Sequence, residues 1–520
     1  MSAAGSPDPE RGASAVEPAM MPVVSREAEA VQAESSARTY RLVLYDALAS
    51  EAMGTLTTGV FLVGFAVELG ASNSAIGLLA SVPFFVQLLQ LPAVVLVERV
   101  RARRTICVWT SGVGRGFLLA AALAPMFAAS AGIAAFIGFL AVHQGMAAVS
   151  GCSWNSWMRD LAPEGEQGRF FGRRTAAATA LATVLVLLGG GFLELWKAYV
   201  PASLTIGYSL LFAVSAVIGL YGVYLLSITP DPAMPAALRH MHPFHLIWGP
   251  LRDGNFRRLV IFLASWSFAV NLAAPFFAVY MLKTLGYPMT TVTALTTASQ
   301  LSNLAALGTW GRLIDRFGNK AVLSVCAPLF LGCMFAWALT GLRWIEPIAL
   351  YALFAIHILM GISTAGMALG SGNLAMKLSP RGEATAYLAA NSVVTSVCGA
   401  IAPIIGGLTA DFFAAHQLTF SFTWSGRAEE ITVQVLSFHE WTFFFAIACF
   451  LGLYSMHRMA MVEEGSGQAD RLFLRDLLLE ARRSMHSLSS AAGLLRIARV
   501  PFSFPRTAAG YSEERPEKPY

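Results

Sequence analysis

Long apolar runs separated by short polar loops fill the chain between residues 41 and 461. Each run reaches the roughly 20 residues that a helix needs to cross the hydrocarbon layer of a bilayer. The pattern therefore predicts an all-α integral membrane protein with twelve spanning helices. They are expected at about 42–69, 74–97, 105–128, 131–153, 174–195, 203–228, 258–283, 288–312, 320–341, 345–369, 384–413 and 440–461.

The first six runs and the last six repeat one pattern at a constant spacing. Three short segments recur 217 residues later (258 − 41, 315 − 98 and 378 − 161). The recurring pairs are Arg41–Leu44 with Arg258–Ile261, Glu98-Arg99 with Asp315-Arg316, and Leu161–Glu166 with Leu378–Glu383. A fixed offset over separate segments indicates a duplicated unit. Two membrane halves related in this way are a common architecture of secondary transporters.

Composition and charge support the membrane assignment. The chain is 56% hydrophobic and only 13% charged, which is too few charges to cover a soluble protein of 520 residues. Lys and Arg total 36 against 31 acids, a net charge of +5. The basic residues gather in alternate loops, so the positive-inside rule explains them without a nucleic-acid partner. We therefore expect a multi-pass protein of a plasma membrane, here a bacterial inner membrane, with both termini in the cytoplasm.

The predicted organisation has two six-helix bundles, at 41–228 and 258–461. Residues 1–40 are acidic and lack apolar periodicity, which predicts a disordered cytoplasmic tail. The linker 229–257 and the tail 462–520 each contain alternating apolar and basic residues, which predicts a short interfacial helix in each. In the loop 414–439, apolar residues alternate on both sides of Ser425-Gly426, which predicts an external β-hairpin.

A loop in the second half carries a recognisable signature. It reads Gly311-Arg-Leu-Ile-Asp315-Arg316-Phe-Gly318-Asn-Lys320. This resembles the signature loop of the major facilitator superfamily, and the duplicated six-span halves resemble that superfamily too. The resemblance implies its two-bundle fold and solute transport. The first copy departs from the signature, with Val94 at the position of Gly311 and Arg101 at the position of Gly318.

The resemblance also gives the loop a gating role. It implies that Asp315 contacts the start of the fifth span, around 168–174, and that by symmetry Glu98 beside Arg99 faces 383–385. Such contacts would hold the cytoplasmic side closed. Gly311 would let two helices approach closely. The alternative is that the arginines of the loop only anchor the protein at the membrane surface.

Two charged residues are expected at similar depth inside the membrane. Glu51 lies ten residues beyond Arg41, and Arg115 lies eleven residues beyond Arg104, which places both about 15–16 Å inside. An ion pair between them is geometrically possible. Because ionisable residues within a span are costly and usually functional, Glu51 is a candidate proton carrier. Asp46 is expected nearer to the membrane edge.

Three further polar residues fall near the middle of predicted spans: His143, Asn271 and His357. The resemblance implies that their spans, together with the first, line a central cavity. None of the three recurs at the offset of 217, and asymmetric polar residues on a symmetric frame are typical of a binding site. The alternative is that each satisfies a backbone carbonyl within the helix packing.

Other chemistry finds no support in the sequence. There is no phosphate-binding loop, no nucleophile with a base, and no metal-binding pattern of cysteines, so we expect no enzyme activity, cofactor or metal. We expect a monomeric secondary transporter that moves a small solute, coupled to H⁺, by alternating access. The alternative is a membrane receptor or assembly factor that retains the fold without transport.

Overall fold

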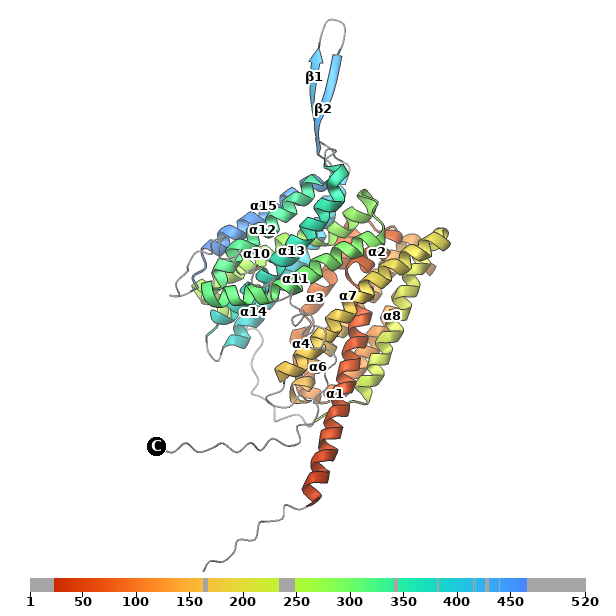
Figure 1. The fold of residues 1–520 in the computed structure, drawn as a ribbon, viewed down its shortest axis with the longest axis vertical. Coiled ribbons are helices and arrows are strands. Elements are labelled where there is room, and N and C mark those ends of the chain that lie inside the picture. Colours follow the sequence, from red (N-terminus) through yellow and green to blue (C-terminus); the bar gives the residue numbers. More distant parts are fainter. Residues whose placement is uncertain are drawn as a thin grey trace, which may run out of the picture.

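The computed structural model describes residues 23–161, 167–232, 248–340, 345–380, 383–414, 416, 418–425, 430–438 and 440–464. The protein is a helical bundle in two halves, from which a β-hairpin projects (Figure 1). We call the end of the molecule that carries the hairpin the hairpin side. The opposite end, where α1 begins, is the linker side.

The first half contains α1 (Val23–Thr57), α2 (Gly59–Glu68), α3 (Asn73–Gln87), α4 (Gln90–Val100), α5 (Arg103–Ala122), α6 (Ala129–Leu161), α7 (Gln167–Tyr199) and α8 (Leu204–Ser227). The second half contains α10 (Gly254–Val279), which continues into a π-helix (Tyr280–Thr284), α11 (Met289–Phe317), α12 (Asn319–Leu339), α13 (Ala349–Lys377), α14 (Ala384–Ala414) and α15 (Glu440–Ala460).

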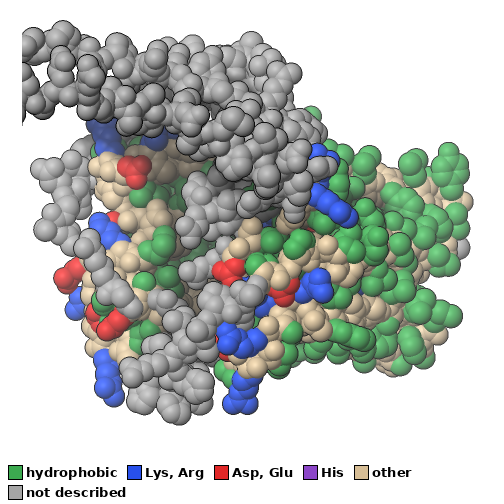
Figure 2. All heavy atoms as spheres, turned by 90° about the horizontal axis from the view of Figure 1, so that it is seen from below, with side chains coloured by type: hydrophobic (Ala, Val, Ile, Leu, Met, Phe, Trp, Pro, Cys, Tyr) green, Lys and Arg blue, Asp and Glu red, His purple; other side chains and the backbone are tan. Residues whose placement is uncertain are grey.

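The described helices make the twelve predicted passages. Ten helices are long and apolar enough to cross a membrane, with α1 and α2 counted as one, and the bent pair α3 and α4 is an eleventh candidate. The twelfth passage is α11, whose 29 residues include many Thr, Ser, Asn and Gln that lower its hydropathy. Seen from the linker side, charged side chains gather on the near face while hydrophobic ones cover a flank, as expected beside lipid (Figure 2).

The repeat at 217 residues is visible in the backbone. At the end of α4, Arg101 adopts a left-handed conformation with φ 54°, and at the end of α11 Gly318 has φ 86°. These positions are 217 apart, and Arg101 is the only non-glycine residue with positive φ in the described part of the chain. Both copies therefore have a residue of positive φ at this position, but the turns differ, since ψ is 21° at Arg101 and 166° at Gly318.

The buried core shows where the halves meet. One hydrophobic cluster joins both halves on the hairpin side, with Phe65 and Phe212 of the first half and Phe276 and Trp337 of the second. On the linker side each half has a separate cluster, around Trp157 in the first half and around Phe256 and neighbouring residues in the second. Among the described residues, the halves thus share a buried core on the hairpin side and have separate ones on the linker side.

Close backbone contact between α3 and α14 completes this junction. A Cβ on Gly77 would collide with the carbonyl oxygen of Pro403, and one on Gly407 would collide with that of Asn73. Only glycine allows the two helices to lie this close.

The hairpin prediction is confirmed. Strand β1 (Leu418–Ser425) pairs antiparallel with β2 (Glu430–Phe438), with an irregularity in register between Phe420 and Ser421. The hairpin stands away from the bundle (Figure 1).

The prediction of disorder through residue 40 is wrong for residues 23–40, which belong to α1. This segment is rich in Ala, Glu, Arg and Gln, which are strong helix formers, so its acidity did not signal disorder. The interfacial helix predicted in the tail 462–520 lies outside the described residues. In the linker, only residues 248–257 of the predicted interfacial segment are described, and they contain a 3-10 turn at Pro250–Arg252.

Candidate functional site

A polar cavity of about 260 Å³ lies inside the first half. Its wall is built by α1, α5, α6, α7 and α8. The charged or titratable side chains on this wall are Asp46, Arg115, His143 and Arg174, and hydroxyl groups come from Ser50, Thr110, Ser111 and Ser150. We call this space the first-half cavity.

Arg115 reaches from α5 across to α1 and α8. It is 7% exposed, and its guanidinium donates to the carbonyl oxygen of Gly219 and to Ser50 Oγ at 2.9 Å. Two glycines of α8 make room for it, because a Cβ on Gly219 would press on the side chain of Arg115 and one on Gly222 would lie 2.9 Å from a guanidinium nitrogen. The small residues of α8 therefore position this buried charge.

Asp46 of α1 lies on the same wall and is only 3% exposed. Ser50 Oγ donates to its carboxylate at 3.4 Å, so one hydroxyl bridges Asp46 and Arg115. Within the described part of the chain, no Lys or Arg nitrogen comes within 4.0 Å of the Asp46 carboxylate. Asp46 was expected nearer to the membrane edge than Glu51; the structure shows it buried among helices of the first half.

Glu51 and Arg115 do not form the ion pair considered from the sequence. Five residues advance a helix by about 140° beyond a full turn, so Glu51 lies on the opposite face of α1 from Asp46. Glu51 is exposed, whereas Asp46 and Met53 face α8. Equal depth was estimated correctly, but the direction around the helix was not considered.

His143 of α6 is brought to the first-half cavity as well. It is 7% exposed, and its Nδ1 lies 2.8 Å from the carbonyl oxygen of Gly114. Nearby, the hydroxyls of Ser111 and Ser150 are 2.7 Å apart, which links α5 to α6 by a second polar contact.

Asn271 and His357 lie elsewhere, within the second half. Asn271 donates to the carbonyl oxygen of Ser267 at 2.8 Å, and His357 Nδ1 lies 2.9 Å from that of Leu353. Each partner is four residues earlier in the same helix. His357 also packs edge-on against Trp337 of α12, with ring centroids 5.4 Å apart. Both contacts agree with the alternative considered from the sequence, in which the side chain hydrogen-bonds a backbone carbonyl within the helix packing.

Arg174 of α7 is a site residue that the sequence reading missed. Its guanidinium lies over the ring of Trp154, 4.6 Å from the centroid, and its Nε is buried without a hydrogen-bond partner. The sequence offered a weak signal, since Arg174 opens the fifth span and Trp154 ends the fourth. It was assigned to the basic loop instead.

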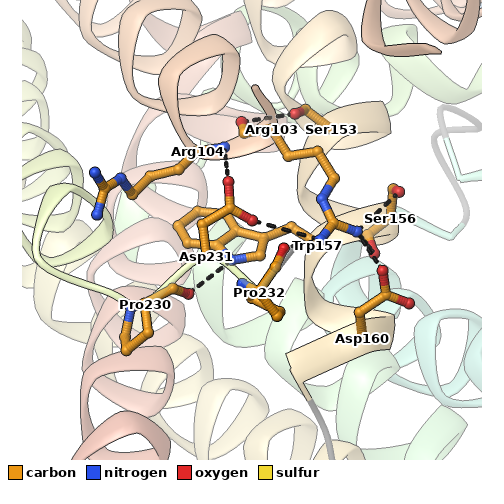
Figure 3. Close-up of polar contacts among 9 residues, drawn as sticks. All are labelled: Arg103, Arg104, Ser153, Ser156, Trp157, Asp160, Pro230, Asp231 and Pro232. Atoms are coloured by element: carbon orange, nitrogen blue, oxygen red, sulfur yellow. Dashed lines mark hydrogen bonds and ion pairs between the residues drawn. The ribbon is translucent and has the colours of Figure 1, made fainter. Parts of the chain in front are cut away.

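A charge network ties the helices of the first half together at the linker side (Figure 3). Arg103 is 1% exposed and donates to Asp160 of α6, to Asp231 at 3.4 Å, and to the carbonyl oxygen of Pro232 at 2.8 Å. The Asp231 carboxylate also accepts from the backbone N–H of Arg104 at 3.2 Å. An acid after the sixth passage thus caps the helix of the third.

The second half repeats this cap. The Glu464 carboxylate accepts from the backbone N–H groups of Asn319 and Lys320 at 2.9 and 2.7 Å and from Lys377 Nζ at 3.2 Å. Burial acts to raise the pKa of Glu464, but these hydrogen bonds outweigh it and hold the pKa below its ordinary value. The signature residue Lys320 is fixed further, because its Nζ donates to the carbonyl oxygens of Ala460 and Val462.

Within the described residues, the acids of the signature loops form no ion pair. Asp315 and Glu98 are both exposed, as are Arg99 and Arg316, and Arg316 lies over the ring of the neighbouring Phe317. The side chains of 168–173, the predicted contact of Asp315, lie outside the described residues. The prediction that Gly311 permits a close helix approach is wrong in this conformation, since a Cβ there would meet no atom within 4 Å. Gly311 lies on a face of α11 that no neighbouring helix covers at that point.

On the hairpin side, two carboxylates join the halves. Glu194 of α7 accepts from the backbone N–H of Met289, the first residue of α11, at 2.7 Å. Asp411 of α14 accepts from the N–H groups of Asn73 and Ser74, at the start of α3, at 3.1 and 2.8 Å. We call these contacts the two carboxylate clamps.

Comparisons with known proteins bear on the fold. A search of curated proteins finds no match. The nucleoside transporter NupG has a solved structure that is 11% identical, with TM-score 0.60, covering 82% of this chain and 98% of that one. A bacterial homologue of the iron transporter ferroportin, in an inward-facing state, is 12% identical with TM-score 0.59, covering 81% and 98%. The E. coli xylose transporter XylE, in an inward-open conformation, is 14% identical with TM-score 0.51, covering 84% and 96%.

At these identities the solved structures show a shared fold and no more. The sequence match is of a different kind. A model of the Major Facilitator Superfamily matches the chain twice, over residues 47–289 and 259–470, in step with the duplication. The chain therefore belongs to the Major Facilitator Superfamily, as a multi-pass membrane protein of that transporter family.

Proposed function

We propose that the protein is a secondary active transporter that couples movement of a small solute to a proton by alternating access. The observation that carries the proposal is the buried Asp46 carboxylate, which shares the first-half cavity with Arg115 and Arg174 but pairs with neither. Burial favours the neutral acid and the nearby guanidiniums favour the charged one. A carboxylate held between these opposing effects can gain and lose a proton as the cavity opens and closes.

Other residues take roles around this site. Arg115 holds Asp46 near the balance between its two forms, and His143 on the same wall contacts the solute or relays the proton. Glu51 remains the rival proton carrier, on the exposed face of α1. A role for Asn271 or His357 in solute binding requires that each leave its present bond within its own helix.

Sidedness follows from the basic loops. The arginines gather on the linker side, so we place that side, and both termini, in the cytoplasm of a bacterial cell. The halves are packed on the hairpin side and separate on the linker side, which corresponds to a state open to the cytoplasm. In the opposite state the linker ends close, and Asp315 and Glu98 contact the facing helix ends of the other half.

A second candidate is a non-transporting receptor or assembly factor. The projecting hairpin is the observation that favours it, because neither edge of a two-stranded sheet is paired and an unpaired edge can bind another chain. The cavity with its buried charges has no purpose in such a protein. We therefore favour the transporter as a monomer.

Reconstitution separates the two. Purified protein in proteoliposomes is screened for uptake of labelled small solutes with and without an imposed proton gradient. We expect one class of solute to accumulate above its external concentration only when the gradient is present, and accumulation to collapse with a protonophore. If the protein binds a solute of the screen but takes up none of them, the receptor is favoured.

A further inference from the structure

The first-half cavity holds more positive than negative charge. Two guanidiniums, of Arg115 and Arg174, share the wall with one carboxylate, that of Asp46. An uncompensated charge inside a membrane protein is costly and is usually retained for a function. A compensating anion is therefore the ligand that these residues would favour.

Arg174 is the group that is left without an acceptor. Arg115 already donates to Ser50 and to the carbonyl oxygen of Gly219. Arg174 has the ring of Trp154 on one face, and within the described residues its guanidinium has no hydrogen-bond acceptor, while its Nε is buried. A guanidinium that lies over a ring, with no acceptor for its donors, can bind a carboxylate or phosphate through two parallel hydrogen bonds.

We infer that the first-half cavity binds a small anion that presents a carboxylate or phosphate to Arg174, together with a proton on Asp46. This inference rests on the proposed function and names its substrate class. The cavity volume of about 260 Å³ lies below that of most drug-sized ligand sites, which limits the anion to a small one.

Protonation of Asp46 makes anion binding easier. Counting only the groups on its wall, the cavity carries one positive charge in excess with Asp46 ionised and two with Asp46 protonated; Glu51, from the other face of α1, offsets part of the charge at Arg174 in both states. The groups that interact with Asp46 are Ser50 of α1, Arg115 and Cys107 from α5, Trp154 from α6 and Arg174 from α7, while α8 contributes glycine there and His143 shares the cavity wall. Because linkage is reciprocal, an anion that binds better to the protonated form also favours protonation. Anion and proton then travel in the same direction.

The order of the two arginines fits access from the linker side. Arg174 lies seven residues from the start of α7 at that side, or about 10 Å along the helix. Arg115 lies twelve residues beyond Arg103 at the start of α5, or about 18 Å along it. An anion that enters from the linker side meets Arg174 before it reaches the deeper guanidinium.

Binding to the purified full-length protein tests the inference without transport. Thermal unfolding in detergent is followed at pH 5.5 and pH 8 with acetate, lactate, succinate or inorganic phosphate, against chloride at equal ionic strength and glucose as a neutral probe. We expect saturable stabilisation by at least one acidic probe, stronger at pH 5.5, and none by glucose. No saturable response to any acidic probe would overturn the inference.

Variants assign the response to the site. Arg174→Gln should weaken binding of the responding anion about tenfold or more, and Arg174→Lys should weaken it less. Arg257→Gln, which removes an exposed arginine of the second half, is the matched control and should bind as the wild type does. With acetate or lactate, whose own charge barely changes between pH 5.5 and pH 8, Asp46→Asn should bind equally at both pH values, a result that a merely structural role would not produce.

The outcomes distinguish this inference from the proposed function. Proton-driven uptake of a neutral solute, with no anion bound or carried, would refute the anion and leave proton coupling intact. An equal response of Arg174→Gln and wild type to the same anion would also refute it, because the ion would then bind elsewhere.

Discussion

Glu194 and Asp411 are 217 residues apart, and each carboxylate accepts hydrogen bonds from backbone N–H groups at the first turn of a helix in the opposite half. The helices that they cap, α11 and α3, are equivalent in the two copies. Both clamps lie on the hairpin side. The duplication has therefore produced a symmetric pair of contacts that holds that side closed, opposite to the signature loops on the linker side.

Loss of a clamp should favour opening on the hairpin side. Asp411→Asn removes a charge from a helix N-terminus, where a carboxylate contributes about 0.5–2 kcal/mol. A cysteine at Ser74 should then react faster with an impermeant thiol reagent from the hairpin side than it does with Asp411 intact. An unchanged rate would mean that the helix packing alone holds this side closed.

The effects of losing the two clamps should be additive. Because Glu194→Gln acts on a separate helix pair, the double variant should open further than either single variant. A double variant no more reactive than Asp411→Asn would indicate that the clamps do not act independently.

Asp315→Asn should raise accessibility of the cavity from the linker side. Asp315 is exposed in the present conformation, so its loss should leave this state unchanged and destabilise only the state in which the linker ends meet. Reaction of a cysteine at Ser50 with a reagent supplied from the linker side reports the shift. If the rate does not rise, the loop serves only to anchor the protein.

Arg103→Ala should destabilise the first half severely. The side chain is 1% exposed and joins α5 to Asp160, Asp231 and the carbonyl oxygen of Pro232. Removal of one partner from a largely buried ion network costs about 3 kcal/mol, somewhat less here because the two acids are partly solvated. Thermal unfolding in detergent measures this, and Arg104→Ala, whose exposed side chain lies outside the network, is the control. Equal loss in both variants would contradict the account.

Glu464 should make stability depend on pH. Its pKa is held below the ordinary value in the folded protein, so its contribution is present at neutral pH and is lost as the pH falls through the lowered pKa. The difference in melting temperature between wild type and Glu464→Gln should therefore be largest near pH 7 and shrink below about pH 4. A difference that does not vary with pH would show that the charge of Glu464 is not what caps α12.

The sequence was sufficient for the architecture because apolar run length and a constant offset are direct consequences of the bilayer and of duplication. The hairpin could be predicted equally well, since segments of alternating apolar and polar residues flank a Ser-Gly turn. The N-terminal extension of α1 was missed because acidity was read as disorder, although the same residues favour a helix.

Only part of the candidate site could be predicted from the sequence. Depth along a helix follows from counting, which placed Arg115 and His143 well inside their spans; the fold then brings both to the first-half cavity. Direction around the helix depends on which neighbour each face meets, and this decided that Asp46, and not Glu51, shares a cavity with Arg115. Arg174 was hidden among loop arginines, because only the fold brings the start of α7 beside Trp154. The two carboxylate clamps could not be predicted, because their donors are backbone N–H groups, which do not depend on the type of residue.

The central claim is that the Asp46 proton drives solute movement, and matched carboxylate variants test it most directly. Proteoliposomes containing wild type, Asp46→Asn or Glu51→Gln are compared for accumulation driven by a proton gradient and for exchange of the same solute at equal pH. The account predicts that Asp46→Asn abolishes accumulation but retains exchange, because a neutral amide resembles the protonated acid, and that Glu51→Gln still accumulates the solute. Full accumulation by Asp46→Asn would contradict the account. Loss of accumulation in Glu51→Gln alone would identify Glu51, on the exposed face of α1, as the proton carrier.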